Sequence, residues 1–489
     1  MSEICLVLTA ATVVENLEIA KRNHSLIDIL ELRTDLLDED QYQLLADFPS
    51  LIDKPVILTC RKVVDGGLWN KDEKQRREYL LNWMEGDYSY IDLEMDLKND
   101  SAVVEKALSR GITIIRSFHD FNTVPADLYE KMISFADDQK TIVKGAVYPQ
   151  TSEELFRLID TALKLKKSDK IDSFILLGMG EFGFPTRILS EKLGSYLTFC
   201  SDSHESRGAP GHCSASDLNN IYNFRNITSS TVINSIIGNP VSQSKSPQIH
   251  NLGYKKKSID AVYVPFLTDS PRWFMEIARL LEIHGSSVTV PFKSEIIPLV
   301  DHIDKSVNQI GASNTIYRDR HGRWLATNTD AYGLIKPLLD FIGVKDLDSR
   351  KVAVIGAGGA ARAAVFALLD MGAQVAIFNR THPKGLELAD LFSCRAYPLE
   401  ESSIEELKEY SSIIVQTTNV GMAPLEHIDP LDFYSFSGDE LVYDIIYKPE
   451  ETLLMKKAAE AGCPVLGGFK MLEEQAYLQF KLFTGIDYN

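Results

Sequence analysis

Residues 351–381 carry the pattern that most constrains the fold of this chain. An apolar run at 352–355 leads into a turn with Gly356, Gly358 and Gly359, and an alanine-rich stretch follows. Glycines at such a turn bring bare N–H groups against a phosphate at the start of a helix. The pattern predicts one strand–turn–helix unit of a doubly wound Rossmann sheet. A tight turn without a ligand would carry the same glycines, so the motif needs support from elsewhere.

That support comes from the end of the next apolar run, 375–378. An acidic residue there would bind the ribose 2′-hydroxyl of NAD, whereas the arginine of this chain suits the 2′-phosphate of NADP. The sequence therefore predicts an NADP(H) site formed by Gly356, Ala357, Gly358, Gly359, Ala360, Asn379, Arg380 and Thr381. Because the motif begins after residue 350, we expect most of the chain to have a function other than binding this cofactor.

Composition sets the broad class of protein. A chain of 489 residues with 45% hydrophobic content is long enough for about three domains. A formal charge of −18 argues against a nucleic-acid partner. The six cysteines have no paired spacing, which indicates reduced thiols of a cytoplasmic protein and no metal site. No apolar run reaches membrane-spanning length, and the apolar start lacks the marks of a signal peptide. We expect small-molecule substrates, and the oligomeric state is left open.

Eight short apolar runs precede residue 205, and amphipathic stretches separate most of them. Eight strands that alternate with helices over about 200 residues predict a (β/α)8 TIM barrel. A doubly wound open sheet is the alternative, but no phosphate-type glycine loop follows any of these runs. The runs are 4–9, 29–33, 55–61, 90–95, 112–118, 141–148, 173–179 and 196–200.

A second α/β region starts with a strand at 231–237 and continues with strands at 262–266, 288–290 and 313–317. An amphipathic helix is expected at 469–483, and we expect it to return and pack on this region. The predicted domains are the barrel at 1–225, a second domain at 231–336 completed by 469–489, and the dinucleotide-binding domain at 337–468.

Lys144 is the most informative residue of the first half, because it stands inside an apolar run. A buried lysine must be neutral or paired, and a neutral amine can form a Schiff base with a ketone. His119, one run earlier, can move protons near neutral pH. The structural alternatives are an ion pair of Lys144 with Glu94 or Glu31, and a histidine that ends a strand. Together with three possible carboxylate holders, the set favours a Schiff-base enzyme for an anionic keto acid; these are Arg33, Arg61 and Arg187.

Residues 1–213 resemble the type I 3-dehydroquinate dehydratases. The matching pieces are Glu31-Leu-Arg33-Thr-Asp35, Arg61 with Gly66-Gly67, Ser117-Phe-His119-Asp120-Phe121, Lys144, Met179-Gly180 and Arg187. The resemblance implies that Lys144 forms an imine with the substrate and that His119 shuttles the proton in a syn elimination of water. It also implies that the substrate is held by Glu31, Arg33, Arg61, Asp65, Arg187 and His212.

Three departures from that family, at Asp65, Gly208 and His212, concern contacts to the substrate. The family usually has Glu where this chain has Asp65, and Ser-Ala-Pro-Gly-Gln where it has Gly208-Ala-Pro-Gly211-His212. They put specificity or rate in question. They also motivate an alternative, in which the barrel is catalytically impaired and serves as a binding or scaffolding module.

Several polar motifs follow strands of the second half. Ser242, Ser244 and Ser246 stand before a helix that we expect to begin at Pro247. Their hydroxyls are candidate ligand contacts, and simple N-capping of the helix is the structural alternative. Lys293 and Asp330 could form a surface salt bridge of little worth, or a proton-transfer dyad in a cleft.

Residues 231–489 resemble the shikimate dehydrogenases. The motifs Ser-x-Ser, Thr-Val-Pro-Phe-Lys, Gly-Ala-x-Asn-Thr, Asn-Thr-Asp, Gly-Ala-Gly-Gly-Ala and Asn-Arg-Thr occur in order. The resemblance implies that Lys293 and Asp330 exchange the proton while the nicotinamide delivers hydride, and that Gly468 lies at the cofactor. The residues implied to hold the substrate are Ser244, Ser246, Thr289, Asn314, Asp330, Tyr447 and Gln475. Ser287 and the segment Gln416-Thr-Thr-Asn419 depart from the family pattern.

The two resemblances together predict a bifunctional enzyme of the shikimate pathway. The barrel would dehydrate 3-dehydroquinate to 3-dehydroshikimate, and the second half would reduce that product to shikimate with NADPH. A dehydrogenase that acts on quinate with NAD is a further alternative. Arg380 argues against it, because an arginine at this position suits NADP.

Overall fold

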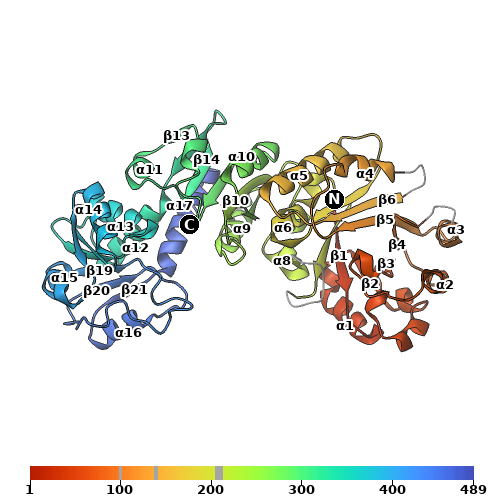
Figure 1. The fold of residues 1–489 in the computed structure, drawn as a ribbon, viewed down its shortest axis with the longest axis horizontal. Coiled ribbons are helices and arrows are strands. Elements are labelled where there is room, and N and C mark those ends of the chain that lie inside the picture. The colour runs from red at the N-terminus through yellow and green to blue at the C-terminus, as the bar shows by residue number, and fades with distance from the viewer. Residues whose placement is uncertain (98–101, 137–140, 204–212) are drawn as a thin grey trace. The chain divides into compact units, whose positions relative to one another are not determined.

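The computed structural model describes residues 1–97, 102–136, 141–203 and 213–489 (Figure 1). The chain divides into two compact units, Met1–His284 and Gly285–Asn489, and each is described by itself. In the described part of the chain, no helix combines the length and the apolar character that a membrane span requires.

The first unit begins with a curled sheet of parallel strands. Neighbouring strands follow the order β7-β6-β5-β4-β3-β2-β1-β8-β9. Tyr196 N donates to Phe174 O at 2.7 Å, which joins the start of β8 to the start of β7. The strands are β1 (Glu3–Leu8), β2 (Ile29–Arg33), β3 (Val56–Thr59), β4 (Tyr90–Glu94), β5 (Thr113–Asp120), β6 (Thr141–Val147), β7 (Phe174–Gly178), β8 (Leu197–Ser201) and β9 (Cys213–Ser214). The eight predicted runs form β1 to β8, and the predicted barrel is confirmed.

Helices lie between most of the barrel strands along the chain, and α5 illustrates why these segments are helical. Its apolar side chains recur at helical spacing and are buried at Leu155, Leu158 and Leu165, while Thr151 Oγ1 caps its first turn by accepting from Glu154 N at 3.2 Å. The helices are α1 (Val13–Asn23), α2 (Glu73–Trp83), α3 (Ala102–Ser109), α4 (Leu128–Ser134), α5 (Ser152–Lys166), α6 (Gly180–Ile188), α7 (Ser190–Leu193) and α8 (Ala215–Asn220). Short 3-10 turns include η5 (Val63–Asp65).

The core of the barrel is built by alternate residues of its strands. Cys5, Ile29, Ile57, Ile115 and Ile142 are buried in one cluster. Because side chains alternate along a strand, the same spacing directs a set of polar side chains into the barrel near the strand ends. The first unit ends with two parallel strands, β10 (Val232–Gly238) and β11 (Ala261–Leu267), and two helices, α9 (Ser246–Lys257) and α10 (Pro271–Leu280).

The second unit begins with a small mixed sheet. Strands β12 (Gly285–Val288), β14 (Thr315–Arg318), β15 (Trp324–Thr327) and β13 (His302–Ile303) lie side by side in that order. The expected strand at 288–290 is therefore displaced, because Ser286 and Ser287 pair with β14 although they lack apolar side chains. The accompanying helices are α11 (Lys305–Ile310), α12 (Thr329–Ile342) and α17 (Phe469–Thr484); α17 contacts α12 and β14.

The rest of the second unit is a doubly wound parallel sheet in the order β18-β17-β16-β19-β20-β21. This is the strand order of a Rossmann fold, as the glycine turn predicted. Apolar clusters cover both faces of the sheet. The elements are β16 (Lys351–Ile355), α13 (Gly359–Asp370), β17 (Gln374–Asn379), α14 (His382–Phe392), β18 (Arg395–Pro398), α15 (Ile404–Tyr410), β19 (Ile413–Gln416), β20 (Leu441–Asp444), α16 (Leu453–Glu460) and β21 (Val465–Gly467).

Candidate active sites

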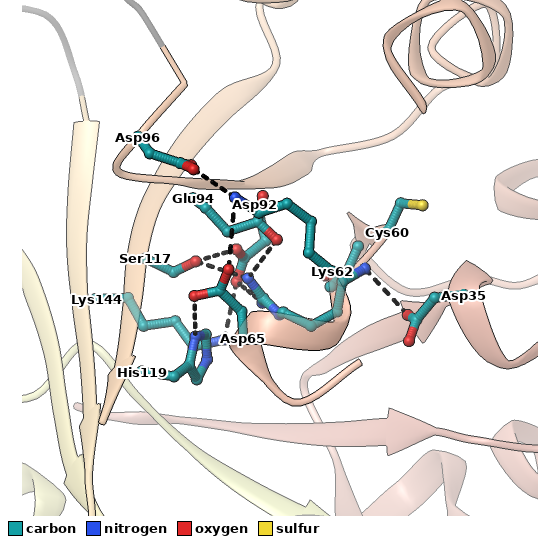
Figure 2. Close-up of polar contacts among 12 residues, drawn as sticks. Asp35, Cys60, Lys62, Asp65, Asp92, Glu94, Asp96, Ser117, His119 and Lys144 are labelled. Carbon is teal, nitrogen blue, oxygen red and sulfur yellow. Dashed lines mark hydrogen bonds and ion pairs between the residues drawn. The ribbon is translucent and has the colours of Figure 1, made fainter. Parts of the chain in front are cut away.

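Lys144 lies on β6 inside the barrel and is only 4% exposed. Its Nζ lies 2.9 Å from Asp92 Oδ2 (Figure 2), 3.5 Å from Glu31 Oε1 and 4.3 Å from the centre of the Phe199 ring. Of the two partners that the sequence suggested, Glu31 lies beside Lys144, whereas Glu94 does not. Asp92 is the second partner instead. The two carboxylates keep a charged amine tolerable at this depth.

Arg61 lies two residues after the end of β3 and is buried. Its Nη2 lies 2.7 Å from Asp92 Oδ2, and its Nη1 donates to Ser117 Oγ at 2.8 Å and lies 3.3 Å from Glu94 Oε1. Burial alone would raise the pKa of Asp92, but the charges of Arg61 and Lys144 lower it well below its usual range. Asp92 is therefore an anion that two cations share.

His119 lies on β5 with a side chain that is 10% exposed. Burial lowers its pKa to about 4, and the nearby charge of Arg61 acts in the same direction. The ring is therefore neutral at neutral pH, as a proton acceptor must be. Phe121 stacks on it with ring centres 6.0 Å apart.

Asp65, in η5, is the acidic residue nearest to that ring. Its Oδ1 lies 3.9 Å from His119 Nδ1, and its Oδ2 lies 3.6 Å from Lys62 Nζ. Within the described ranges, Nδ1 of His119 is buried without a hydrogen-bond partner. The side chain of Asp65 is one methylene shorter than the glutamate of the family pattern, and its carboxylate therefore stops short of Nδ1.

Arg187, on α6, is fully buried, and burial lowers its pKa to about 10. Its Nη1 donates to Phe199 O at 3.3 Å, while Nε and Nη2 have no partner among the residues that the structure describes. Two unpaired N–H groups of a guanidinium can bind a carboxylate in a bidentate manner. Arg33, by contrast, is already held by Asp35 through two bonds of 2.9 and 2.8 Å.

A cavity of about 350 Å³ brings these side chains together. Seven residues that the sequence singled out line it, namely Glu31, Arg33, Arg61, Asp65, His119, Lys144 and Arg187. His212, the eighth, lies outside the described residues, as does Gly208. The arrangement offers an amine, a neutral base and guanidinium groups around one small polar ligand.

In the second unit, Lys293 Nζ lies 2.5 Å from Asp330 Oδ2, and both side chains are partly buried. Asn314 Nδ2 donates to Asp330 Oδ1 at 2.7 Å, and Ser313 N donates to Lys293 O at 2.7 Å. Asp330 lies in the first turn of α12, where the helix dipole favours its negative charge. The pair is therefore a positioned dyad rather than two mobile surface charges.

The other predicted substrate residues are divided between the units. Ser244 and Ser246 belong to the first unit, where Ser244 Oγ accepts from Ser246 N at 3.2 Å. The helix α9 begins at Ser246, one residue before the expected Pro247. In the second unit Gln475 is buried on α17, Thr289 is half-buried and Tyr447 is exposed.

The glycine turn leaves open space before α13. A Cβ atom on Gly358 or Gly359 would meet no atom within 4 Å, whereas one on Gly356, at φ +113°, would lie 2.7 Å from Thr417 Oγ1. A dinucleotide phosphate fits such a helix start. Arg380 is exposed directly after β17, where it can reach a ligand at this edge of the sheet. Gly468 is required for close packing, since its Cβ would lie 2.0 Å from Ile445 O.

Two residues that support these sites were missed by the sequence reasoning. Arg76, on α2, is 1% exposed and binds Glu94, but its helix reads as a charged surface helix. Gln479, on α17, accepts from Ser287 Oγ at 2.7 Å and donates to Thr315 Oγ1 at 2.8 Å. No short-range signal identifies either, because their partners lie far away in the sequence. In the described ranges, no group of His, Cys, Asp or Glu side chains could hold a metal ion.

Comparison with known families covers most of the chain. The type I 3-dehydroquinase family matches residues 4–229, the shikimate dehydrogenase substrate binding domain matches 236–316, and the shikimate / quinate 5-dehydrogenase family matches 341–423.

Three curated relatives extend this result. The chloroplastic bifunctional 3-dehydroquinate dehydratase/shikimate dehydrogenase of Arabidopsis thaliana is 32% identical over 492 residues, which cover 96% of this chain and 80% of that protein. The shikimate biosynthesis protein AroDE of Chlamydia pneumoniae is 30% identical over 95% of this chain and 92% of its own length. The shikimate dehydrogenase (NADP(+)) of Shouchella clausii is 39% identical over 51% of this chain and 92% of its own length. The chain belongs to the family of bifunctional shikimate-pathway enzymes that combine a type I 3-dehydroquinate dehydratase with a shikimate dehydrogenase.

Proposed function

We propose that the dehydratase reaction proceeds through an imine on Lys144 and that the reduction uses NADPH with Lys293 and Asp330 as the proton-transfer pair. The dehydratase part of this proposal rests on the buried amine of Lys144, which lies beside Asp92 and Glu31 in one cavity with the neutral His119. The product of the barrel is then the ketone that the second unit consumes.

In the dehydratase half, the neutral amine of Lys144 adds to the substrate ketone and water leaves, which forms a C=N⁺ bond. The neutral ring of His119 removes a proton from the carbon next to this bond, and the iminium accepts the electron pair. His119 then returns the proton to the departing hydroxyl, so that water leaves, and hydrolysis of the iminium frees Lys144. Asp92, 2.9 Å from the nitrogen, offsets the positive charge of the iminium.

Substrate binding in the cavity is assigned to the charged side chains that line it. The free N–H groups of Arg187 support a carboxylate contact there, and Arg33, Arg61, Glu31 and Asp65 would bind the hydroxyls. His212 is proposed as a further contact from resemblance alone.

In the dehydrogenase half, Lys293 donates a proton to the carbonyl oxygen as it becomes an alcohol, and Asp330 holds the ammonium in place. Bound NADPH supplies the hydride. Asn314, which already binds Asp330, is proposed to hold the substrate, together with Ser244, Ser246, Thr289, Tyr447 and Gln475.

NADP(H) is proposed as the cofactor because Arg380 offers an exposed positive charge after β17, where the 2′-phosphate would lie. The name of the Shouchella clausii relative supports the same choice. The phosphates would bind the turn from Gly356 to Ala360. Asn379, Thr381 and Gly468 are further proposed contacts.

The domain boundaries at 1–225, 231–336 with 469–489, and 337–468 are part of this proposal. So is a cytoplasmic location, which the free cysteine thiols of the described residues support.

Borohydride trapping tests the imine. Incubation of the wild type with 3-dehydroquinate and borohydride should add the reduced substrate to the peptide that contains Lys144, and K144A should acquire no adduct. A wild type that remains unlabelled while it still reduces 3-dehydroshikimate would favour the alternative, a barrel that serves only as a binding or scaffolding module.

A further inference from the structure

Arg76 connects helix α2 to the interior of the barrel. Although five of the eleven residues of α2 are charged, the Arg76 side chain is 1% exposed. Its Nη1 donates to Glu94 Oε2 at 2.8 Å and to Cys60 O at 2.9 Å. Its Nε and Nη2 donate to the two oxygens of Glu73 at 2.8 and 3.0 Å. All three nitrogens of the guanidinium are thus engaged, and they hold its position firmly.

The contacts of Arg76 continue to Lys144 as a chain of alternating charges. Glu94 binds Arg76 with one oxygen and lies 3.3 Å from Arg61 with the other. Arg61 in turn lies 2.7 Å from Asp92, and Asp92 lies 2.9 Å from Lys144. Every member between Arg76 and Lys144 is buried, so water screens these interactions only weakly.

Charge balance in the barrel depends on Arg76. Three buried carboxylates, Glu31, Asp92 and Glu94, face the two cations Arg61 and Lys144. Without a third cation the group would hold one unpaired negative charge, which is costly in a buried site. Arg76 supplies that cation from outside the barrel wall.

We infer that Arg76 is a positioning residue of the dehydratase, which neutralises Glu94 and thereby leaves Arg61 free to be shared with Asp92. This inference rests on the proposed imine at Lys144. Arg76 touches neither the cavity nor Lys144, and it acts through Glu94 and Arg61.

Loss of the Arg76 charge should hold Lys144 more strongly as an ammonium ion. Without Arg76, Glu94 attracts Arg61 more strongly, so Arg61 interacts less with Asp92, and Asp92 interacts more with Lys144. The net negative charge that the substitution adds also stabilises the ammonium form. The amine must be neutral to attack, so the acidic limb of the pH–rate profile moves to higher pH. The charged or titratable groups that face Lys144 from the other strands of the barrel are Cys5, Glu31, Arg61, Asp92 and His119.

The test compares R76Q with R77Q. Gln removes the charge of Arg76 but keeps an N–H donor. Arg77 is the next residue of the same helix, is 44% exposed and binds the same Glu73 at 3.3 Å, which makes it a matched control. The readouts are the dehydratase pH–rate profile, the pH dependence of borohydride trapping, and the dehydrogenase activity of the same chain as a measure of intact protein.

We expect the acidic limb of R76Q to move up by about one pH unit, which lowers dehydratase kcat/KM about tenfold at a pH on the limb. The rate should recover at high pH. R76K, which keeps the charge, should stay close to the wild type, and so should R77Q. A loss in R76Q that is the same at every pH would overturn the inference, as would an unchanged profile.

A second variant covers the case in which R76Q does not fold. Glu73 is 40% exposed, so E73Q should fold, and it removes a negative charge that opposes Arg76. Its acidic limb should move in the opposite direction, to lower pH, by about 0.3 unit. No movement, or movement to higher pH, would overturn the inference. Failure of the proposed function is recognised separately, because the wild type itself would then give no adduct at Lys144.

Discussion

A single oxygen of Asp92 lies 2.9 Å from Lys144 Nζ and 2.7 Å from Arg61 Nη2. One buried carboxylate on β4 thus holds two buried cations, one that follows β3 and one on β6. The other oxygen accepts from Ser117 Oγ at 2.5 Å, so the carboxylate is fixed in place. The contact with Asp92 fixes the position of the Lys144 amine.

Replacement of Asp92 by Asn should destabilise the barrel. Two cations would lose their shared anion, and breaking a buried ion pair from one side costs about 3 kcal/mol. Urea unfolding measures the loss. D96N is the matched control, because Asp96 is 70% exposed and binds Lys62 at the surface, so its loss should stay below about 1 kcal/mol. Equal losses in the two variants would contradict the account.

His119 should make stability depend on pH in a defined window. Burial lowers its pKa from 6.5 to about 4, so between these values the unfolded chain binds a proton that the folded chain does not. Stability is therefore lost as pH falls from 6.5 toward 4, and His119 contributes no slope above 6.5. Between pH 7.5 and 5.0, H119N should lose about 2 kcal/mol less than the wild type in urea unfolding. Identical slopes for the two proteins would refute this.

Asp65→Glu should close the gap to His119. The longer side chain can reach Nδ1, which lies 3.9 Å from the present carboxylate, and orient the ring as a base. We expect dehydratase kcat to rise about threefold. The nearer negative charge favours the protonated ring, so the acidic limb should move to higher pH, while D65N should move it to lower pH. A decrease of kcat in D65E, with D65N unchanged, would show that the shorter side chain is the better fit.

Arg380→Ala should weaken NADPH binding selectively. Loss of a charged contact to the 2′-phosphate is worth about 2 kcal/mol, which raises the KM for NADPH more than tenfold. The KM for NADH should change less than about twofold, because NADH lacks that phosphate. R395A is a control on the neighbouring strand β18, where the exposed Arg395 begins the strand rather than following its end. Parallel changes for both cofactors would count against the role of Arg380.

Residues with local signals were predicted well. The apolar runs of the barrel marked all eight strands, and Lys144, His119 and Arg61, which the sequence singled out, line one cavity. The glycine turn predicted the Rossmann sheet, and the backbone at Gly356, with φ +113°, favours glycine there.

Features that depend on long-range partners were not predicted. Of the two predicted partners of Lys144, Glu31 lies 3.5 Å from its amine, but Glu94, which shares its register layer through Ser117, does not pair with it. The long lysine side chain reaches Asp92 instead. The strand β12 has the sequence Gly-Ser-Ser-Val and is held by pairing with β14, so no apolar pattern marks it. Arg76 is buried only because Glu94 and Cys60 O lie behind it.

A coupled assay tests the central claim most directly. The purified chain alone is given 3-dehydroquinate and NADPH, and the formation of shikimate is followed with the wild type, K144A, K293A and a mixture of the two variants. The account predicts shikimate from the wild type and from the mixture. It predicts none from K144A or from K293A, and accumulation of 3-dehydroshikimate only in K293A. Shikimate formation by K144A alone, or loss of both activities in either single variant, would contradict it.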